Sequence, residues 1–316
     1  LFRSNLVVPA LMVVGLGLLT WVNYGSTTEF SLSTMTPTFG GFSDVILLAA
    51  IAYAFAGLES ASVLSEEVQD PRRNVPRALA KSGLMVLGIY ILISWTILTV
   101  LPADQVSGLT GLPDTARVAG TRLVGATTGG VLGSLVALSL CVASFGTVSA
   151  WMAIGARMPF AAGLDGYLPA AFGTLHPKYA TPHVAVITLG IVTAGLIILG
   201  SMGGTAQEVY RTFISLEIIT YFVPYLYMFA ALLVMQGRPT EEGVQRAPFA
   251  PYGAYLAGAT GLVVTGASLV FALIPSESVA DPTFFYITVF GTVALLTIGG
   301  LAVYANGKSR RNRRQA

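Results

Sequence analysis

The stretch YAFAGLESASVLSEEVQDPRRNVPRALAK, residues 53 to 81, decides the architecture of this chain. It begins inside an apolar run, interrupts that run with Gly57 and the ionisable Glu59, and then leaves it through a loop dense in charged residues. In a bilayer, a carboxyl group within a hydrophobic span is costly unless it faces a cavity or a partner. Glu59 is therefore a candidate functional residue, and Gly57 is the point at which we expect a helix to break.

The composition of the whole chain indicates an integral membrane protein. Of its 316 residues, 54% are hydrophobic and only 10% are charged, whereas a soluble domain carries about 25% charged residues. Cys141 is the only cysteine, so no internal disulfide can form and the sequence carries no redox signature.

Apolar stretches of membrane-spanning length recur along the sequence. A helix needs about 20 predominantly apolar residues to cross the hydrocarbon core, and eight stretches meet or approach that length. The sequence thus predicts an all-α membrane protein with eight transmembrane helices. These stretches are residues 6–22, 42–64, 83–101, 130–156, 184–200, 213–234, 252–274 and 284–304.

The basic residues predict the orientation of these spans, because Lys and Arg collect in cytoplasmic loops. With the amino end placed inside, the inner segments hold 14 of the 17 Lys and Arg residues, and the outer segments hold only Arg117, Arg122 and Arg211. Miscounting by one span would invert every later loop and spoil the pattern. We therefore expect both ends of this segment to be cytoplasmic, with a solvated basic tail at 306–316.

Glycines in the outer loop and the span that follows it indicate close helix packing. Gly125, Gly129 and Gly133 are four residues apart, and small residues at this spacing let membrane helices approach each other. The preceding segment TARVAGTRLVG, residues 115–125, predicts a short helix lying on the membrane surface.

Glu59 has two interpretations. It is either a structural carboxyl hydrogen-bonded to another helix, or a functional group at the depth where transporters bind substrate. Counting back from Glu66 at about 1.5 Å per residue places it about 10 Å inside the membrane. At that depth, uptake and release of a proton near physiological pH become feasible. The ends of a helix that breaks at Gly57 also carry partial charges, which can meet a carboxylate or an ammonium group.

Four other residues are weighed in the same way. Glu217 is a second acidic residue in an apolar span, and it either reaches interfacial water or acts in function. Trp151 either packs in the core or covers the cation or aliphatic part of a substrate. His176 and His183 have no further ligands at a metal-binding spacing, so we expect no metal site and no cofactor.

Three sequence segments together resemble one known family. AFAGLESASVLSEEVQDPRRNVPRA, GLDGYLPAAFGTLHPKYATPHVAV and FVPYLYMFAAL occur in that order. They are similar to the sixth helix with its following loop, the loop between the eighth and ninth helices, and the tenth helix of the amino acid-polyamine-organocation superfamily of permeases. The resemblance is closest to bacterial amino acid permeases and antiporters.

This resemblance implies a fold of two five-helix repeats in opposite orientations, the LeuT-like fold, with two further helices. The eight spans then correspond to the fifth through the twelfth helix of a single membrane domain over residues 1–316. Residues 5–23 resemble the fifth helix, 42–234 the second repeat and 252–305 the two accessory helices. We expect the chain to be the carboxyl-terminal portion of a longer protein that supplies the first four helices.

The resemblance also implies roles for residues around the break. Tyr53 resembles the aromatic residue of the sixth helix that covers substrate, although related antiporters have tryptophan there. Ala56, Gly57 and Leu58 resemble the unwound backbone that binds substrate. Glu59 matches an acidic position linked to proton sensing in acid-resistance antiporters.

Trp151 resembles a tryptophan of the eighth helix that packs on substrate in those antiporters. Together these matches imply a secondary transporter of amino acids or related amines in the plasma or inner membrane, working by alternating access. Glu59 and Glu217 are the candidate proton-coupling residues, and protons, substrate and the lipid bilayer are the expected partners.

Two alternatives come from other classes of protein. A channel-like or non-transporting scaffold subunit would use the same spans, although the sequence shows no repeated pore lining or ring of charges. A membrane-embedded enzyme would need a nucleophile with its base or a set of metal ligands within the spans, and none is evident. We expect neither an enzyme nor a nucleic-acid partner.

Overall fold

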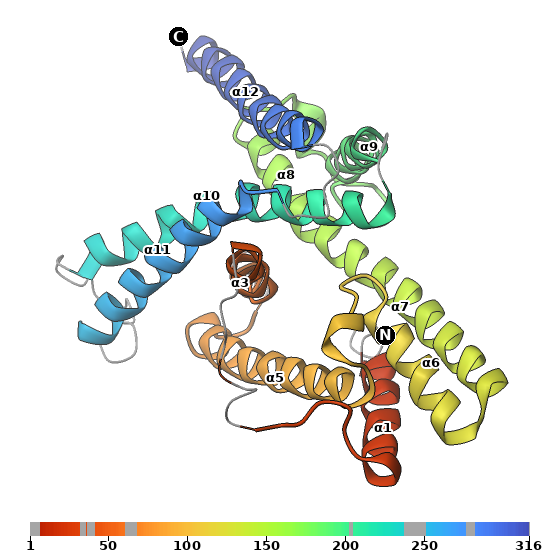
Figure 1. Cartoon of the computed structure of the whole chain (residues 1–316). Coiled ribbons are helices and arrows are strands. Elements are labelled where there is room, and N and C mark those ends of the chain that lie inside the picture. Colours follow the sequence, from red (N-terminus) through yellow and green to blue (C-terminus); the bar gives the residue numbers. More distant parts are fainter. Residues whose placement is uncertain are drawn as a thin grey trace. The chain divides into compact units, whose positions relative to one another are not determined.

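The computed structural model describes residues 7–31, 36, 42–60, 68–201, 205–236, 251–275 and 282–315. Within these ranges every regular element is helical, which confirms the all-α class (Figure 1). The α-helices are α1 (Val7–Tyr24), α3 (Phe42–Ala54), α5 (Pro71–Val100), α6 (Gly111–Val124), α7 (Ala126–Gly155), α8 (Arg157–Leu164), α9 (His183–Gly200), α10 (Ala206–Gln236), α11 (Tyr252–Ala272) and α12 (Pro282–Gln315). Two short 3₁₀ helices, η2 (Ala103–Gln105) and η3 (Ala170–Gly173), lie in loops.

Six helical segments of the described chain are long and apolar enough to cross a membrane. They are Pro71–Val100, Ala126–Leu164, His183–Gly200, Glu208–Gln236, Tyr252–Ala272 and Pro282–Ser309. The other two predicted spans, 6–22 and 42–64, contain shorter helices: the apolar part of α1 is Pro9–Tyr24, and α3 has 13 residues. Residues 61–64 of the second of these spans lie outside the described residues.

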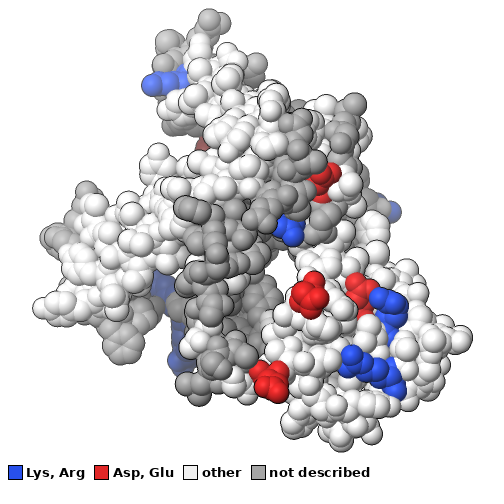
Figure 2. Space-filling model, viewed as in Figure 1, with Lys and Arg blue, Asp and Glu red and all other residues white. Residues whose placement is uncertain are grey.

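Large apolar side chains lie on the outer faces of these helices. Phe145 is 76% exposed, Tyr227 75% and Leu84 72%. On the face in view in Figure 2, few side chains are charged. In water such surfaces would be unfavourable, whereas in a bilayer they contact lipid of the same polarity.

The described residues form two compact units. The first contains α1, α6, α7 and most of α5. Its core packs Val13 of α1 against Ala116 of α6 and Val136 of α7. At one end of α1, the hydroxyl of Tyr24 donates to the carbonyl oxygen of Arg122 at 2.6 Å, and the hydroxyl of Thr27 donates to that of Thr99 at 2.8 Å.

Helices α6 and α7 form an antiparallel hairpin in which two of the predicted packing glycines lie at the contact. A Cβ atom on Gly129 would come within 2.5 Å of the backbone nitrogen of Thr121, and one on Gly133 within 3.1 Å of the carbonyl oxygen of Pro113. Gly125 differs, because it joins the two helices with a φ of 106° and a Cβ there would meet no atom within 4 Å. The packing interpretation is therefore confirmed for Gly129 and Gly133 and is wrong for Gly125. The predicted helix at 115–125 is present as α6, packed against α1 and α7.

The second unit contains α3 and α8 to α12. Its core is built from Ala49 of α3, Phe222 of α10, and Phe285 and Val289 of α12, all nearly inaccessible. Helices α10 and α11 lie side by side (Figure 1). Near the end of α12, the ring of Tyr304 stacks on Tyr167 at 5.7 Å, and a Cβ on the neighbouring Gly307 would come within 2.5 Å of the Tyr167 backbone.

Candidate functional site

The helix that begins at Phe42 is interrupted at the glycine singled out in the sequence. Helix α3 ends at Ala54, and residues 55–59 form turns before Ser60. The N–H of Ala56 donates to the carbonyl oxygen of Tyr53 at 2.9 Å, and the N–H of Ser60 donates to that of Gly57 at 3.2 Å. Gly57 has a φ of 103°, a conformation that residues with a Cβ rarely adopt. The backbone therefore leaves the α-helix where the sequence predicted a break.

The side chain of Glu59 accepts a hydrogen bond from the backbone of this break. Its Oε2 atom accepts a hydrogen bond from the N–H of Gly57 at 3.0 Å. The hydroxyl oxygen of Tyr225 lies 3.3 Å from the same nitrogen and also accepts from it. In this structure the N–H of Gly57, expected to face substrate, is thus used by two side chains of the protein.

Two tyrosines of α10 hold the carboxylate of Glu59. Tyr221 donates its hydroxyl proton to Oε1, and Tyr225 donates to Oε2. The tyrosines are four residues apart and share one face of the helix. This geometry is that of a structural carboxyl hydrogen-bonded to another helix, which is one of the two interpretations of Glu59. A functional role for Glu59 stays a prediction.

Glu217 lies on the same face of α10, one turn before Tyr221. Its Oε2 atom accepts a hydrogen bond from the hydroxyl of Tyr53 on α3 at 2.8 Å. The ring of Tyr53 meets that of Tyr221 edge to face, with centroids 6.0 Å apart. A row of Glu217, Tyr221 and Tyr225 therefore faces the broken helix, and it joins the two carboxylates that the sequence analysis treated separately.

Sequence reasoning missed Tyr221 and Tyr225 as members of this site. The signal that would have identified them is their spacing. Counting from Glu217, both tyrosines fall at steps of four, which places polar groups on one stripe of an otherwise apolar helix.

The remaining predicted site residues lie in different surroundings. Ala56 packs against the core of the second unit. Leu58 is 36% exposed. Trp151 is 44% exposed and belongs to the first unit. The substrate roles of these three residues stay predictions.

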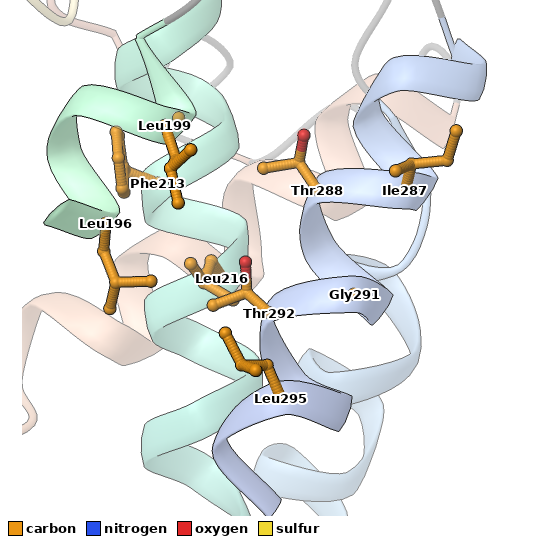
Figure 3. A pocket seen from close by; sticks show the side chains of 10 residues that line it. Leu196, Leu199, Phe213, Leu216, Ile287, Thr288, Gly291, Thr292 and Leu295 are labelled. Carbon is orange, nitrogen blue, oxygen red and sulfur yellow. The ribbon is translucent and has the colours of Figure 1, made fainter. Parts of the chain in front are cut away.

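A separate cavity of about 170 Å³ lies between α9, α10 and α12 (Figure 3). Its walls are mainly apolar, and the side chains of Thr288 and Thr292 on α12 point toward α10 (Figure 3). The lining residues are Leu196, Leu199, Gly200, Phe213, Leu216, Ile287, Thr288, Gly291, Thr292 and Leu295. No residue of the break is among the described residues that line this cavity, and none of those lining residues carries a charge that would recognise an amino acid or an amine.

The two histidines lie close together near the start of α9. The rings of His176 and His183 are 5.5 Å apart. Within the part of the chain that the structure describes, no group of three or more His, Cys, Asp or Glu side chains is placed to hold a metal ion.

Comparison with known proteins gives a family and several relatives. A model of the amino acid permease family matches residues 1–295. An uncharacterized transporter of Legionella pneumophila is 24% identical over 298 residues, which are 94% of this chain and 62% of the relative. The putrescine transporter PotE of Escherichia coli is 25% identical over 226 residues, 71% of this chain and 49% of the relative.

A third relative is a probable agmatine/putrescine antiporter, AguD, of Lactococcus lactis. It is 22% identical over 301 residues, which are 93% of this chain and 62% of the relative. The chain thus spans between about half and two thirds of the length of these relatives. The family match covers most of the chain, in which six described helices are long and apolar enough to cross a membrane. The chain belongs to the amino acid permease family, within the amino acid-polyamine-organocation superfamily, and is a multi-pass membrane protein.

Proposed function

We propose that this chain is part of a secondary transporter of amino acids or related amines, with substrate bound where the helix breaks at Gly57. The observation that carries the proposal is the network at the break, in which Tyr53, Glu59 and Glu217 connect the broken segment to α10. Polar groups that lie inside an apolar span and meet at irregular backbone are typical of substrate sites in transporters. Two relatives named as putrescine or agmatine transporters favour amines as the substrate class.

In the proposed cycle the protein works by alternating access. The ends of the broken helix hold polar groups of the substrate, and Tyr53 covers its body. Glu59 gains and loses a proton between states. Because Glu59 is bonded to both the break and α10, a change in its protonation would alter the contact between these two elements.

The eight-span topology with both ends cytoplasmic, in a LeuT-like arrangement in the cell membrane, forms part of the proposal. Contacts within each unit support it, because they join segments predicted to lie on the same side of the membrane. Tyr24 contacts Arg122, and both belong to predicted outer segments. Tyr167 and Gly307 contact each other, and both belong to predicted inner segments.

Uptake by the full-length protein in proteoliposomes tests the proposal. We expect uptake of radiolabelled putrescine or amino acids to saturate with concentration and to accelerate when unlabelled substrate is present on the opposite side. Empty liposomes are the control. A current without saturation would instead identify a channel, and the absence of any flux would favour the scaffold interpretation.

The role of Glu59 is tested separately by Glu59→Gln, which removes the ionisable group but keeps an oxygen acceptor for the tyrosines. We expect transport by this variant to lose its dependence on external pH. If uptake and its pH dependence remain as in the wild type, proton coupling does not use Glu59.

A further inference from the structure

Glu217 differs from Glu59 in the number of hydrogen bonds that its carboxylate receives. Glu59 accepts from Tyr221, Tyr225 and the N–H of Gly57. Glu217 accepts one hydrogen bond, from Tyr53 to its Oε2 atom, and no other described residue donates to it. Of the two carboxylates at the break, Glu217 has more acceptor capacity left.

Among the described residues, no positively charged side chain forms an ion pair with Glu217. The ion pair found among these residues joins Arg117 and Asp114. The Glu217 side chain is nevertheless accessible, whereas its neighbours Leu216, Ile218 and Ile219 are buried. An ionised carboxylate in an apolar span is stable only when a cation or a set of donors compensates its charge. One tyrosine supplies a single donor, so Glu217 in its ionised form has room for a positive partner.

The group that fits this position is an ammonium group. It carries a full positive charge and three donors, which match the unused acceptor positions of the carboxylate. Glu59, which its own partners already surround, offers no comparable position.

We infer that Glu217 binds an ammonium group of the substrate and makes this transporter selective for organic dications over singly charged amines. Tyr53 acts as a positioning residue, because its hydroxyl holds one oxygen of Glu217 and leaves the other for the ligand. This inference rests on the proposed function. Glu217 is thereby assigned to the recognition of substrate charge, whereas the sequence predicted it as a candidate proton-coupling residue.

The test compares two ligands of the same length that differ by one charge, putrescine and 4-aminobutanol, as competitors of uptake by the full-length protein. We expect the wild type to prefer putrescine, and Glu217→Gln to lower this preference by about tenfold or more, which corresponds to about 1.4 kcal/mol. Glu217→Asp keeps the charge and should retain most of the preference. Glu208→Gln is the matched control, because Glu208 is in the first turn of the same helix and bonds to Thr205.

Each outcome distinguishes this inference from the function on which it rests. If the wild type transports no amine or amino acid, the proposed function is wrong. If the wild type transports putrescine and Glu217→Gln keeps its preference for it, the function stands and the inference is overturned. Loss of pH dependence with an unchanged preference would also overturn it, in favour of proton coupling. If Glu217→Gln does not fold, loss of the preference in the folded Glu217→Asp variant would refute selection by charge.

Discussion

Replacing Glu59 by leucine tests whether its carboxylate holds the broken helix to α10. The change removes the carboxylate acceptor of the hydroxyls of Tyr221 and Tyr225, and it leaves the N–H of Gly57 with the hydroxyl oxygen of Tyr225 as its acceptor. A buried donor left without an acceptor costs about 1–3 kcal/mol. These groups are half-buried, so the lower end of that range applies to each. The two tyrosine donors then lower the free energy of unfolding by about 2 kcal/mol.

A double-mutant cycle isolates the part of this cost that belongs to the tyrosines. In a background where Tyr221 and Tyr225 are both phenylalanine, Glu59→Leu removes only the bond from Gly57. The same substitution should then cost about 1 kcal/mol, because Gly57 has no second acceptor in this background, and this leaves a coupling energy of about 1 kcal/mol. Glu59→Gln is the matched control, because it keeps the length and one oxygen acceptor.

The assay is unfolding of the full-length protein from mild detergent by added SDS, followed by circular dichroism. All four combinations of the Glu59 and tyrosine substitutions are measured under one set of conditions. If Glu59→Leu costs the same with and without the tyrosine hydroxyls, the carboxylate does not couple the break to α10. The network would then be a consequence of the fold and not a cause of its stability.

Three further predictions concern glycines. Gly129→Leu should destabilise the α6–α7 hairpin by about 3 kcal/mol or more, because its side chain meets backbone atoms that have no room to move. Gly130→Leu, whose Cβ meets nothing within 4 Å, should be nearly neutral in the same unfolding measurement, and equal effects would refute the packing argument. Gly57→Ala should cost about 1–3 kcal/mol through its positive φ and lower substrate affinity, and an unchanged KM would contradict the placement of substrate at the break. Gly307→Val should lower thermal stability by disrupting the contact with the loop after α8, whereas Gly300→Val, with open space around it, should not.

The helical class, the apolar spans and the break at Gly57 followed from the sequence, because each depends on a local property. Apolar length decides whether a helix can cross the bilayer. Gly57 and Glu59 are only two residues apart in the chain, so their effect on the helix can be recognised without knowledge of any partner. The resemblance to amino acid permeases rests on contiguous motifs for the same reason.

Spacing alone could not separate the roles of similar residues. Gly125, Gly129 and Gly133 share one interval, yet the first forms a turn and the other two contact α6. What distinguishes them is whether another helix approaches, and the interval carries no information about that. In the same way, the two acidic residues of the spans look alike in sequence.

The sequence by itself therefore determined that Glu59 and Glu217 lie in apolar stretches, where each needs a partner. Only the tertiary structure decided which partners they have. Tyr221 is 162 residues from Glu59 along the chain, and Glu217 is 164 residues from Tyr53. The packing of α3 beside α10 brings these pairs together, and it surrounds Glu59 with donors while leaving Glu217 with one. Hydrogen-bond capacity is a property of the residue, but its use depends on which distant helix comes within about 3 Å.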